Sequence, residues 1–336
     1  MTPREKFITA LELKEPPGRV PHFELVFFLT MEAFGRIHPA HRYFTQWKQM
    51  SYSEQELHRR DIADLYLMIA EKYEHSAIFF HPPAGWGENE VQETIRTLEL
   101  IRELSEGKYF VMIHGDATYA IPSGDKLMDF IYEIADNPRK IKDNAQQMVD
   151  QAVRKAEIFE KSGVLDGFAL CNDYCFNAGP FISPSMFDEF ITPYLAELIQ
   201  AYRQMGFYVI KHTDGNIMPI LDSLVAANPH ALHSLDPQGG IDIAKIKRKI
   251  GHKVCLIGNV NCSLLDTGTE NQVVESVRYA LKHGMPNGGY IFSTSNCIYT
   301  GMNLKCYELM LDVWKKEGNY QEKTKCNNFC QDISNE

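Results

Sequence analysis

The feature that most constrains the fold of this 336-residue chain is a repeated alternation of short apolar segments with amphipathic segments of helical periodicity. Most of the apolar segments lack the polar–apolar alternation of a half-exposed strand. We therefore expect strands that are buried on both faces, as in a parallel sheet covered by helices. The eight predicted strands are residues 20–25, 76–81, 109–114, 167–170, 207–212, 231–235, 254–260 and 289–293.

The segments between these strands carry helix signals. Ile141, Ala145 and Val149 fall on one helical face, and Thr269 with Gln272 has the spacing of a capping box. Eight strands that alternate with helices predict an α/β protein with a (β/α)8 TIM barrel. A doubly wound open sheet would show the same alternation, but no Gly-x-Gly-x-x-Gly follows the first predicted strand, which weakens that alternative.

The barrel is expected to fill one domain over residues 1–318. Residues 26–60 are rich in aromatic residues and histidines, and we interpret them as an N-terminal insertion over the barrel mouth. Residues 319–336 are polar and are predicted to form a loose C-terminal tail.

The composition limits the partners that we expect. The formal net charge of −10 disfavours binding to nucleic acid and to anionic membranes. No run of about 18 apolar residues is present, so we expect no membrane span, and the first seven residues lack the apolar core of a secretion signal. Eight cysteines without such a signal predict reduced thiols and a cytoplasmic protein.

Polar residues after two predicted strands form a candidate metal site, because the active site of a barrel lies at the carboxyl ends of its strands. His212 and Asp214 end the fifth strand, and side chains at i and i+2 of an extended segment point the same way. Cys297 follows the eighth strand. One imidazole, one carboxylate and one thiolate suit zinc with an open fourth position. The competing interpretation is a chance His-x-Asp pair beside a buried cysteine.

Three more ionisable residues near strand ends are catalytic candidates. Asp173, after the fourth strand, either meets a substrate or orients a ligand, or else it caps a loop. Glu24, at the end of the first strand, either contacts substrate or metal or makes a structural ion pair. His81, after the second strand, is either a base or a histidine packed among aromatic rings. Substrate contacts are assigned to Phe80, Trp86, Tyr174 and Asn259.

Several short motifs in a fixed order give the chain a family resemblance. They are Thr2–Phe7 with Arg19–Pro21, Gly179–Phe187, His212–Asn216, Gly258–Val260 and Gly288–Ile291. With these motifs the chain resembles the uroporphyrinogen decarboxylase superfamily over residues 1–318, and within it the corrinoid-dependent methyltransferases. The fold of that family is a (β/α)8 barrel, in agreement with the eight predicted strands.

The resemblance implies the methyltransferase branch. The decarboxylases have arginines early in the chain and an aspartate after the second strand, whereas Leu25–Gly35 has no arginine and no such aspartate follows. In the methyltransferases, a His-x-Cys-Gly-Asn motif and a later cysteine bind catalytic zinc. His212 and Cys297 match two of those ligands, and Asp214 replaces the other cysteine. A carboxylate leaves more positive charge on zinc than a thiolate does, which suits an ether or alcohol oxygen.

From the resemblance we expect a zinc-dependent methyltransferase that moves a methyl group between a small methylated substrate and the cobalt of a corrinoid protein. The chain has no Asp-x-His-x-x-Gly cobalamin motif, so the corrinoid (cobalamin) is expected on a partner protein that docks at the barrel mouth. Three alternatives are open: another decarboxylase, a zinc-free methyltransferase with Asp214 as acid or base, and a non-catalytic binding paralogue. The aromatic residues that favour a methoxylated aromatic substrate are Phe27, Phe28, Phe80, Trp86 and Phe176.

Overall fold

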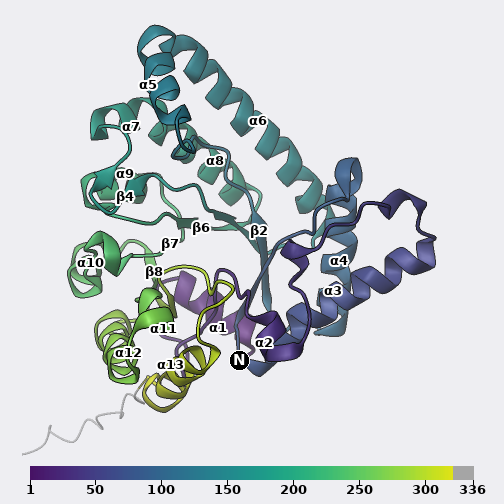
Figure 1. Cartoon of the computed structure of the whole chain (residues 1–336). Coiled ribbons are helices and arrows are strands. Elements are labelled where there is room, and N and C mark those ends of the chain that lie inside the picture. The colour runs from purple at the N-terminus through teal and green to yellow at the C-terminus, as the bar shows by residue number, and fades with distance from the viewer. Residues whose placement is uncertain (321–336) are drawn as a thin grey trace, which may run out of the picture.

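A curled sheet of seven parallel strands forms the centre of the protein, with helices around it, in a computed structural model that describes residues 1–320 (Figure 1). Neighbouring strands follow one another along the chain, in the order β1-β2-β3-β6-β7-β8-β9. The strands are β1 (Ala77–Phe80), β2 (Phe110–His114), β3 (Gly167–Leu170), β6 (Tyr208–His212), β7 (Ala231–His233), β8 (Cys255–Val260) and β9 (Tyr290–Thr294), with a separate antiparallel pair of β4 (Cys175–Phe176) and β5 (Gly179–Pro180).

The helices lie on the outside of the sheet, apart from α1, and several begin at the capping signals of the sequence (Figure 1). Thr2 and Thr269 form capping boxes, and Ser183 caps a helix that opens with Pro184. The α-helices are α1 (Pro3–Leu11), α2 (Thr30–Phe34), α3 (Tyr52–Lys72), α4 (Glu90–Leu104), α5 (Lys126–Asp136), α6 (Pro138–Ser162), α7 (Pro184–Phe190), α8 (Thr192–Gln204), α9 (Leu221–Ala226), α10 (Ile243–Ile250), α11 (Ser263–Thr267), α12 (Glu270–Gly284) and α13 (Leu304–Glu317). The 3-10 helices are η1 (Pro39–His41), η2 (Trp47–Gln49), η3 (Gly87–Asn89), η4 (Met218–Ile220) and η5 (Pro237–Gly239).

Seven of the eight predicted strands are confirmed, with boundaries that differ by at most two residues. The prediction of a regular strand over residues 20–25 is corrected. His22 makes an isolated parallel bridge to Phe292 of β9, and the His22 carbonyl accepts a hydrogen bond of 2.6 Å from the Ser76 N–H next to β1. The segment therefore connects the two edge strands of the sheet without forming a ladder of its own, and Pro21 contributes no N–H to such a ladder.

Side chains alternate along each strand between an inner core and an outer core. Met112, Ala169, Ile210 and Ile257 belong to the inner cluster, whereas their neighbours in sequence pack between the sheet and the helices. Helix α1 closes the amino-terminal end of this interior, since the ring of Phe7 lies 4.8 Å from that of Phe110. The alternation also decides which polar residues at the opposite end of the strands face inward.

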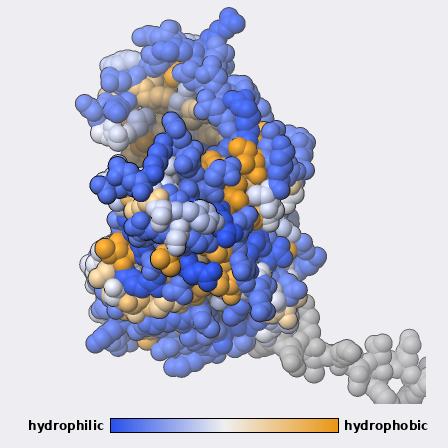
Figure 2. All heavy atoms as spheres, turned by 90° about the vertical axis from the view of Figure 1, so that its right-hand side faces the viewer, coloured by the Kyte–Doolittle hydropathy of each residue, from blue (hydrophilic) through white to orange (hydrophobic). Residues whose placement is uncertain are grey.

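Residues 26–60 contain α2, η1, η2 and the start of α3, and they are joined to loops at the carboxyl ends of strands. Phe27 bridges to Ile298 after β9, and Tyr43 bridges to Ala84 after β1. The face that carries α3 and α4 is mostly hydrophilic with scattered hydrophobic spots (Figure 2). Among residues 1–320, no helix has both the length and the apolar character needed to cross a bilayer.

The chain after α13 is tied to the fold at two points. Asn319 forms an isolated bridge with Arg19, and the Tyr320 N–H donates to the Gly18 carbonyl at 2.9 Å. The remainder of the predicted tail, residues 321–336, lies outside the described residues.

Candidate metal centre

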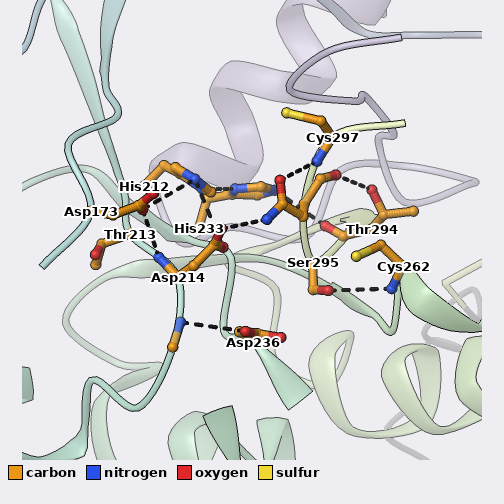
Figure 3. Close-up of polar contacts among 12 residues, drawn as sticks. Asp173, His212, Thr213, Asp214, His233, Asp236, Cys262, Thr294, Ser295 and Cys297 are labelled. Atoms are coloured by element: carbon orange, nitrogen blue, oxygen red, sulfur yellow. Dashed lines mark hydrogen bonds and ion pairs between the residues drawn. The ribbon is translucent and has the colours of Figure 1, made fainter. Parts of the chain in front are cut away.

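The candidate centre is built around the last residue of β6. Because Ile210 faces the interior, the alternation of the strand turns Lys211 outward and His212 inward. The parallel register of β6 and β7 sets His212 beside His233. Two histidines therefore meet inside the carboxyl-terminal end of the sheet (Figure 3).

Three ligand atoms converge at this point. Asp173, His212 and Asp214 each offer one atom, and these atoms all lie within 4.8 Å of one another. The Nε2 atom of His212 is 3.8 Å from Asp173 Oδ1 and 3.8 Å from Asp214 Oδ1. Asp214 Oδ1 is buried and has no hydrogen-bond partner among residues 1–320. A buried carboxylate oxygen without a partner, facing a histidine nitrogen and a second carboxylate, fits a cation with nitrogen and oxygen ligands.

The loops after β3 and β6 hold one another in place. The Asp214 N–H donates to Asp173 Oδ1 at 3.0 Å, and the Tyr174 N–H donates to Thr213 Oγ1 at 2.9 Å. Gly215 has a φ of +76°, and a Cβ there would lie 2.6 Å from the Cys175 carbonyl oxygen. Glycine is therefore required for the close approach of the two loops that carry Asp173 and Asp214.

Burial controls the charges of the centre. It raises the pKa of Asp214 to about 7, and the negative charges of Asp173 and Asp236 act in the same direction. Burial lowers the pKa of His212 to about 4, so its imidazole is neutral near pH 7. Burial also raises the pKa of Cys297 to about 12, with Asp214 and Glu24 nearby, so the thiol is protonated in the metal-free protein.

Cys297 is not among the three converging residues. Its backbone N–H donates to Asn296 Oδ1 at 2.6 Å, and the Asn296 amide donates to Asp214 Oδ2. Figure 3 shows Cys297 at the opposite end of the drawn group from Asp173. The structure thus brings His212 and Asp214 close together, with Asp173 and not Cys297 as the third residue of the group.

Glu24 and His81, the other two catalytic candidates, are not among the three converging residues. Glu24 is 3 % exposed, and its Oε2 accepts from Ser293 Oγ and from the Thr294 N–H, both at 3.2 Å. Burial raises the pKa of Glu24 to about 8. The His81 ring packs on Phe79 with ring centres 4.3 Å apart. Burial lowers the pKa of His81 to about 4.

Three of the four residues assigned to substrate contacts, Phe80, Trp86 and Tyr174, belong to the outer core. Phe80 and Trp86 belong to the outer core, because alternation along β1 turns Phe79 inward and Phe80 toward the helices. The Tyr174 hydroxyl lies 2.6 Å from Thr118 Oγ1, and Tyr174 is fully buried. Asn259 lies at the carboxyl end of β8, and its amide donates to the Leu235 carbonyl at 2.9 Å.

Sequence reasoning missed His233 and Asn296. His233 lies two residues after Ala231, which belongs to the inner core, so the period of a strand would have turned it inward. The pairing of β6 with β7 then predicts that it meets His212. Asn296 carries no comparable signal, because its contact with Asp214 depends on the path of the loop after β9.

Comparisons with known proteins complete the description of the site. The sequence pattern of the family described as uroporphyrinogen decarboxylase (URO-D) matches residues 117–317, which include all three converging residues. No curated protein matches the chain. A methyltransferase from Methanosarcina mazei has a similar fold, with a TM-score of 0.72 at 16 % identity over 94 % of this chain and 99 % of that chain. A GH5_18 from Bifidobacterium longum subsp. infantis has a TM-score of 0.48 at 11 % identity over 90 % of this chain and 80 % of that chain.

Proposed function

Because this chain belongs to the uroporphyrinogen decarboxylase family, we propose that it is a metal-dependent methyltransferase that works with a corrinoid protein. It moves a methyl group between a small methylated substrate and the cobalt of that partner. The observation that carries the proposal is the convergence of Asp173, His212 and Asp214, where the buried Asp214 Oδ1 finds no hydrogen-bond partner within residues 1–320. The name of the Methanosarcina mazei neighbour, a methyltransferase with the same fold, supports the choice of reaction.

The metal that suits these donors is zinc, held by His212 and Asp214 with Asp173 as the third ligand in place of Cys297. Zinc accepts one imidazole and carboxylate oxygens as ligands. When bound, zinc would supply a Lewis acid for the oxygen that the methyl group leaves or joins. The chain itself supplies a neutral His212 and a hydrogen bond from Asn296 that orients the Asp214 carboxylate.

The substrate that we propose is a methoxylated aromatic compound bound at the carboxyl-terminal end of the curled seven-stranded sheet. Phe28 packs against the inner core together with Cys171 and Cys297, so an aromatic side chain lies at the end of the interior that carries the candidate centre. The ring of His41 lies 4.4 Å from that of Phe28. Residues 26–60 would cover this substrate, and the corrinoid protein would dock beside them.

A zinc-free methyltransferase is the second candidate, and one observation favours it. The pKa of Asp214 is raised to about 7 by burial, so its carboxyl group can donate a proton to a departing oxygen near neutral pH. In that mechanism Asp173 keeps the proton on Asp214 by its negative charge, and Cys297 has a structural role.

The test is methylation of cob(I)alamin by methoxy-aromatics, methylamines and methanol, combined with elemental analysis of the purified protein. We expect about one zinc ion per chain and methyl transfer from a methoxy-aromatic that is lost with a chelator. His212→Ala should lose both zinc and activity, whereas His252→Ala, at an exposed residue before β8, should keep both.

Three results would contradict this function. Full activity of a zinc-free preparation would select the acid–base mechanism of Asp214. Release of carbon dioxide from a porphyrinogen without added metal would select a decarboxylase. Capture of a corrinoid protein without methyl transfer from any methoxy compound would indicate a binding paralogue.

A further inference from the structure

His233 is buried beside the candidate centre and has no place in the proposed reaction. Its Nδ1 lies 2.7 Å from Nδ1 of His212, and its Nε2 lies 3.2 Å from the Thr294 carbonyl oxygen (Figure 3). Both imidazoles are almost inaccessible to water, with exposed fractions of 4 % for His212 and 1 % for His233, and burial disfavours their charged forms. Each ring therefore carries one proton, and the contacts decide where it is.

The proton positions follow from the Thr294 carbonyl, which can only accept a hydrogen bond. The His233 Nε2 must carry the hydrogen of that bond, so its Nδ1 has none and acts as an acceptor. The His212 Nδ1 must then donate across the 2.7 Å contact. His212 is left with an unprotonated Nε2, which is the atom that faces Asp173 and Asp214.

We propose that His233 is a positioning residue that fixes the Nδ1–H tautomer of His212 and so turns a bare Nε2 toward the two carboxylates. A histidine side chain in water, without a neighbouring hydrogen-bond partner, favours the opposite tautomer with hydrogen on Nε2. In that tautomer Nε2 cannot bind a metal. The metal-binding part of the inference rests on the proposed function, but the tautomer itself does not. Nitrogen ligands of metals are commonly oriented by such an outer hydrogen bond.

Glu24 is the last residue of the series of hydrogen bonds that begins at His212. The Ser293 hydroxyl, 3.4 Å from His233 Nε2, has its own hydrogen directed at Glu24 Oε2, 3.2 Å away. Ser293 can therefore only accept from His233, which reinforces the proton on His233 Nε2. Glu24, a catalytic candidate from the sequence, orients Ser293 in this arrangement. Ser293, His233 and His212 lie between Glu24 and the two carboxylates.

The experiment compares His233→Leu, which has no acceptor, with His233→Asn, whose side-chain oxygen takes the position of Nδ1. Two-bond proton–nitrogen NMR of the metal-free, histidine-labelled full chain reports the tautomer, with the His212 signal assigned from His212→Ala. We expect hydrogen on Nδ1 of His212 in the wild type and in His233→Asn, and a shift toward Nε2–H in His233→Leu. Zinc affinity, measured by competition with a chromophoric chelator, should fall about 10–100-fold in His233→Leu and recover in His233→Asn.

His252→Leu, at an exposed histidine, is the matched control and should change neither the tautomer nor the affinity. A wild-type His212 signal with hydrogen on Nε2 would overturn the inference, as would a leucine variant with the wild-type tautomer. If the Nδ1–H tautomer is present but no methyl transfer is found, the inference stands and the proposed function fails. Circular dichroism of both His233 variants shows whether they are folded, and the asparagine variant keeps the test open if the leucine variant is not.

Discussion

Two polar clusters lie on opposite sides of β6, and they differ in how completely their hydrogen bonds are satisfied. On the outer side, Lys211 and Asp116 form an ion pair of 2.8 Å with no exposure of either side chain. Lys211 also donates to the Asn172 carbonyl at 2.8 Å, and Asp116 accepts from Thr118. On the inner side, Asp214 Oδ1 has no hydrogen-bond partner in the described part of the chain and lies near a second carboxylate. The outer cluster meets the requirement that buried polar groups be hydrogen-bonded, whereas the inner cluster meets it only in part.

The electrostatics of the two clusters support this difference. Burial alone would raise the pKa of Asp116, but the Lys211 ammonium group and several hydrogen bonds lower it below its usual value. The pKa of Asp214 is instead raised to about 7 by burial and by Asp173. Asp116 is thus stabilised in its charged form, and Asp214 is not. Lys211 and His212, adjacent residues of β6, therefore lie in different electrostatic environments, because their side chains point to opposite faces of the strand.

The largest effect is expected from breaking the outer cluster. Lys211→Met leaves the Asp116 carboxylate buried without its cation, which should lower the free energy of unfolding by about 3–5 kcal/mol. Chemical denaturation of the metal-free protein measures this change. The matched control is Lys249→Met, which breaks an exposed ion pair with Asp222 and should cost less than about 1 kcal/mol. Equal losses in the two variants would remove the structural distinction between the outer cluster and an ordinary surface pair.

A smaller effect is expected from the pH dependence that Glu24 imposes on the inner side. Burial raises the pKa of Glu24 from 4.5 to about 8, so the folded chain keeps its proton where the unfolded chain loses it. The contribution of Glu24 to stability is full below about pH 4.5 and is lost as the pH rises to about 8. The loss should amount to a few kcal/mol.

Thermal or chemical unfolding of the metal-free protein across this pH range measures the slope. Glu24→Gln should flatten it, whereas Glu103→Gln, at an exposed residue of α4, should leave it unchanged. If the slope of Glu24→Gln matches that of the wild type, Glu24 is ionised in the folded protein and does not cause the pH dependence.

The smallest change in stability should come from the inner cluster itself. Asp214→Asn removes the repulsion between two carboxylates, so we expect the free energy of unfolding of the metal-free protein to stay the same or rise by about 1 kcal/mol. Zinc affinity should fall in the same variant, because a carboxylate ligand is lost. Chemical denaturation measures the free energy of unfolding, and competition with a chelator measures the zinc affinity; the two should not fall together. A variant that is destabilised by several kcal/mol would show that Asp214 serves the fold, as Lys211 does.

The strand pattern of the sequence predicted most of the fold because parallel strands buried on both faces read as short apolar runs. Residues 20–25 are apolar in the same way, yet they make only isolated bridges, since the pattern reports burial and not hydrogen bonding. Residues 26–60 show the same limit. Their sequence is rich in aromatic residues and histidines, but their bridges to Ala84 and Ile298 depend on the folded loops.

The candidate centre was predictable where its residues are close in the chain. His212 is the last residue of β6 and Asp214 follows it by two positions, so their proximity follows from the local chain. Asp173 was recognised as a polar residue at a strand end, but its distance of 3.8 Å from His212 depends on how two loops pack. Cys297 satisfied the same rule for strand ends, and the loop that carries it places Asn296 against Asp214 instead.

By itself, the sequence determined the alternation of strands and helices, the inward direction of His212 and His233, and the reach of the family pattern over residues 117–317. Only the tertiary structure decided that Asp173 joins His212 and Asp214, and that Nδ1 of His212 lies 2.7 Å from Nδ1 of His233. The physical reason is that periodicity along a strand fixes which face a side chain takes. Distances between atoms on different strands depend instead on register and on the loops, which no local pattern encodes.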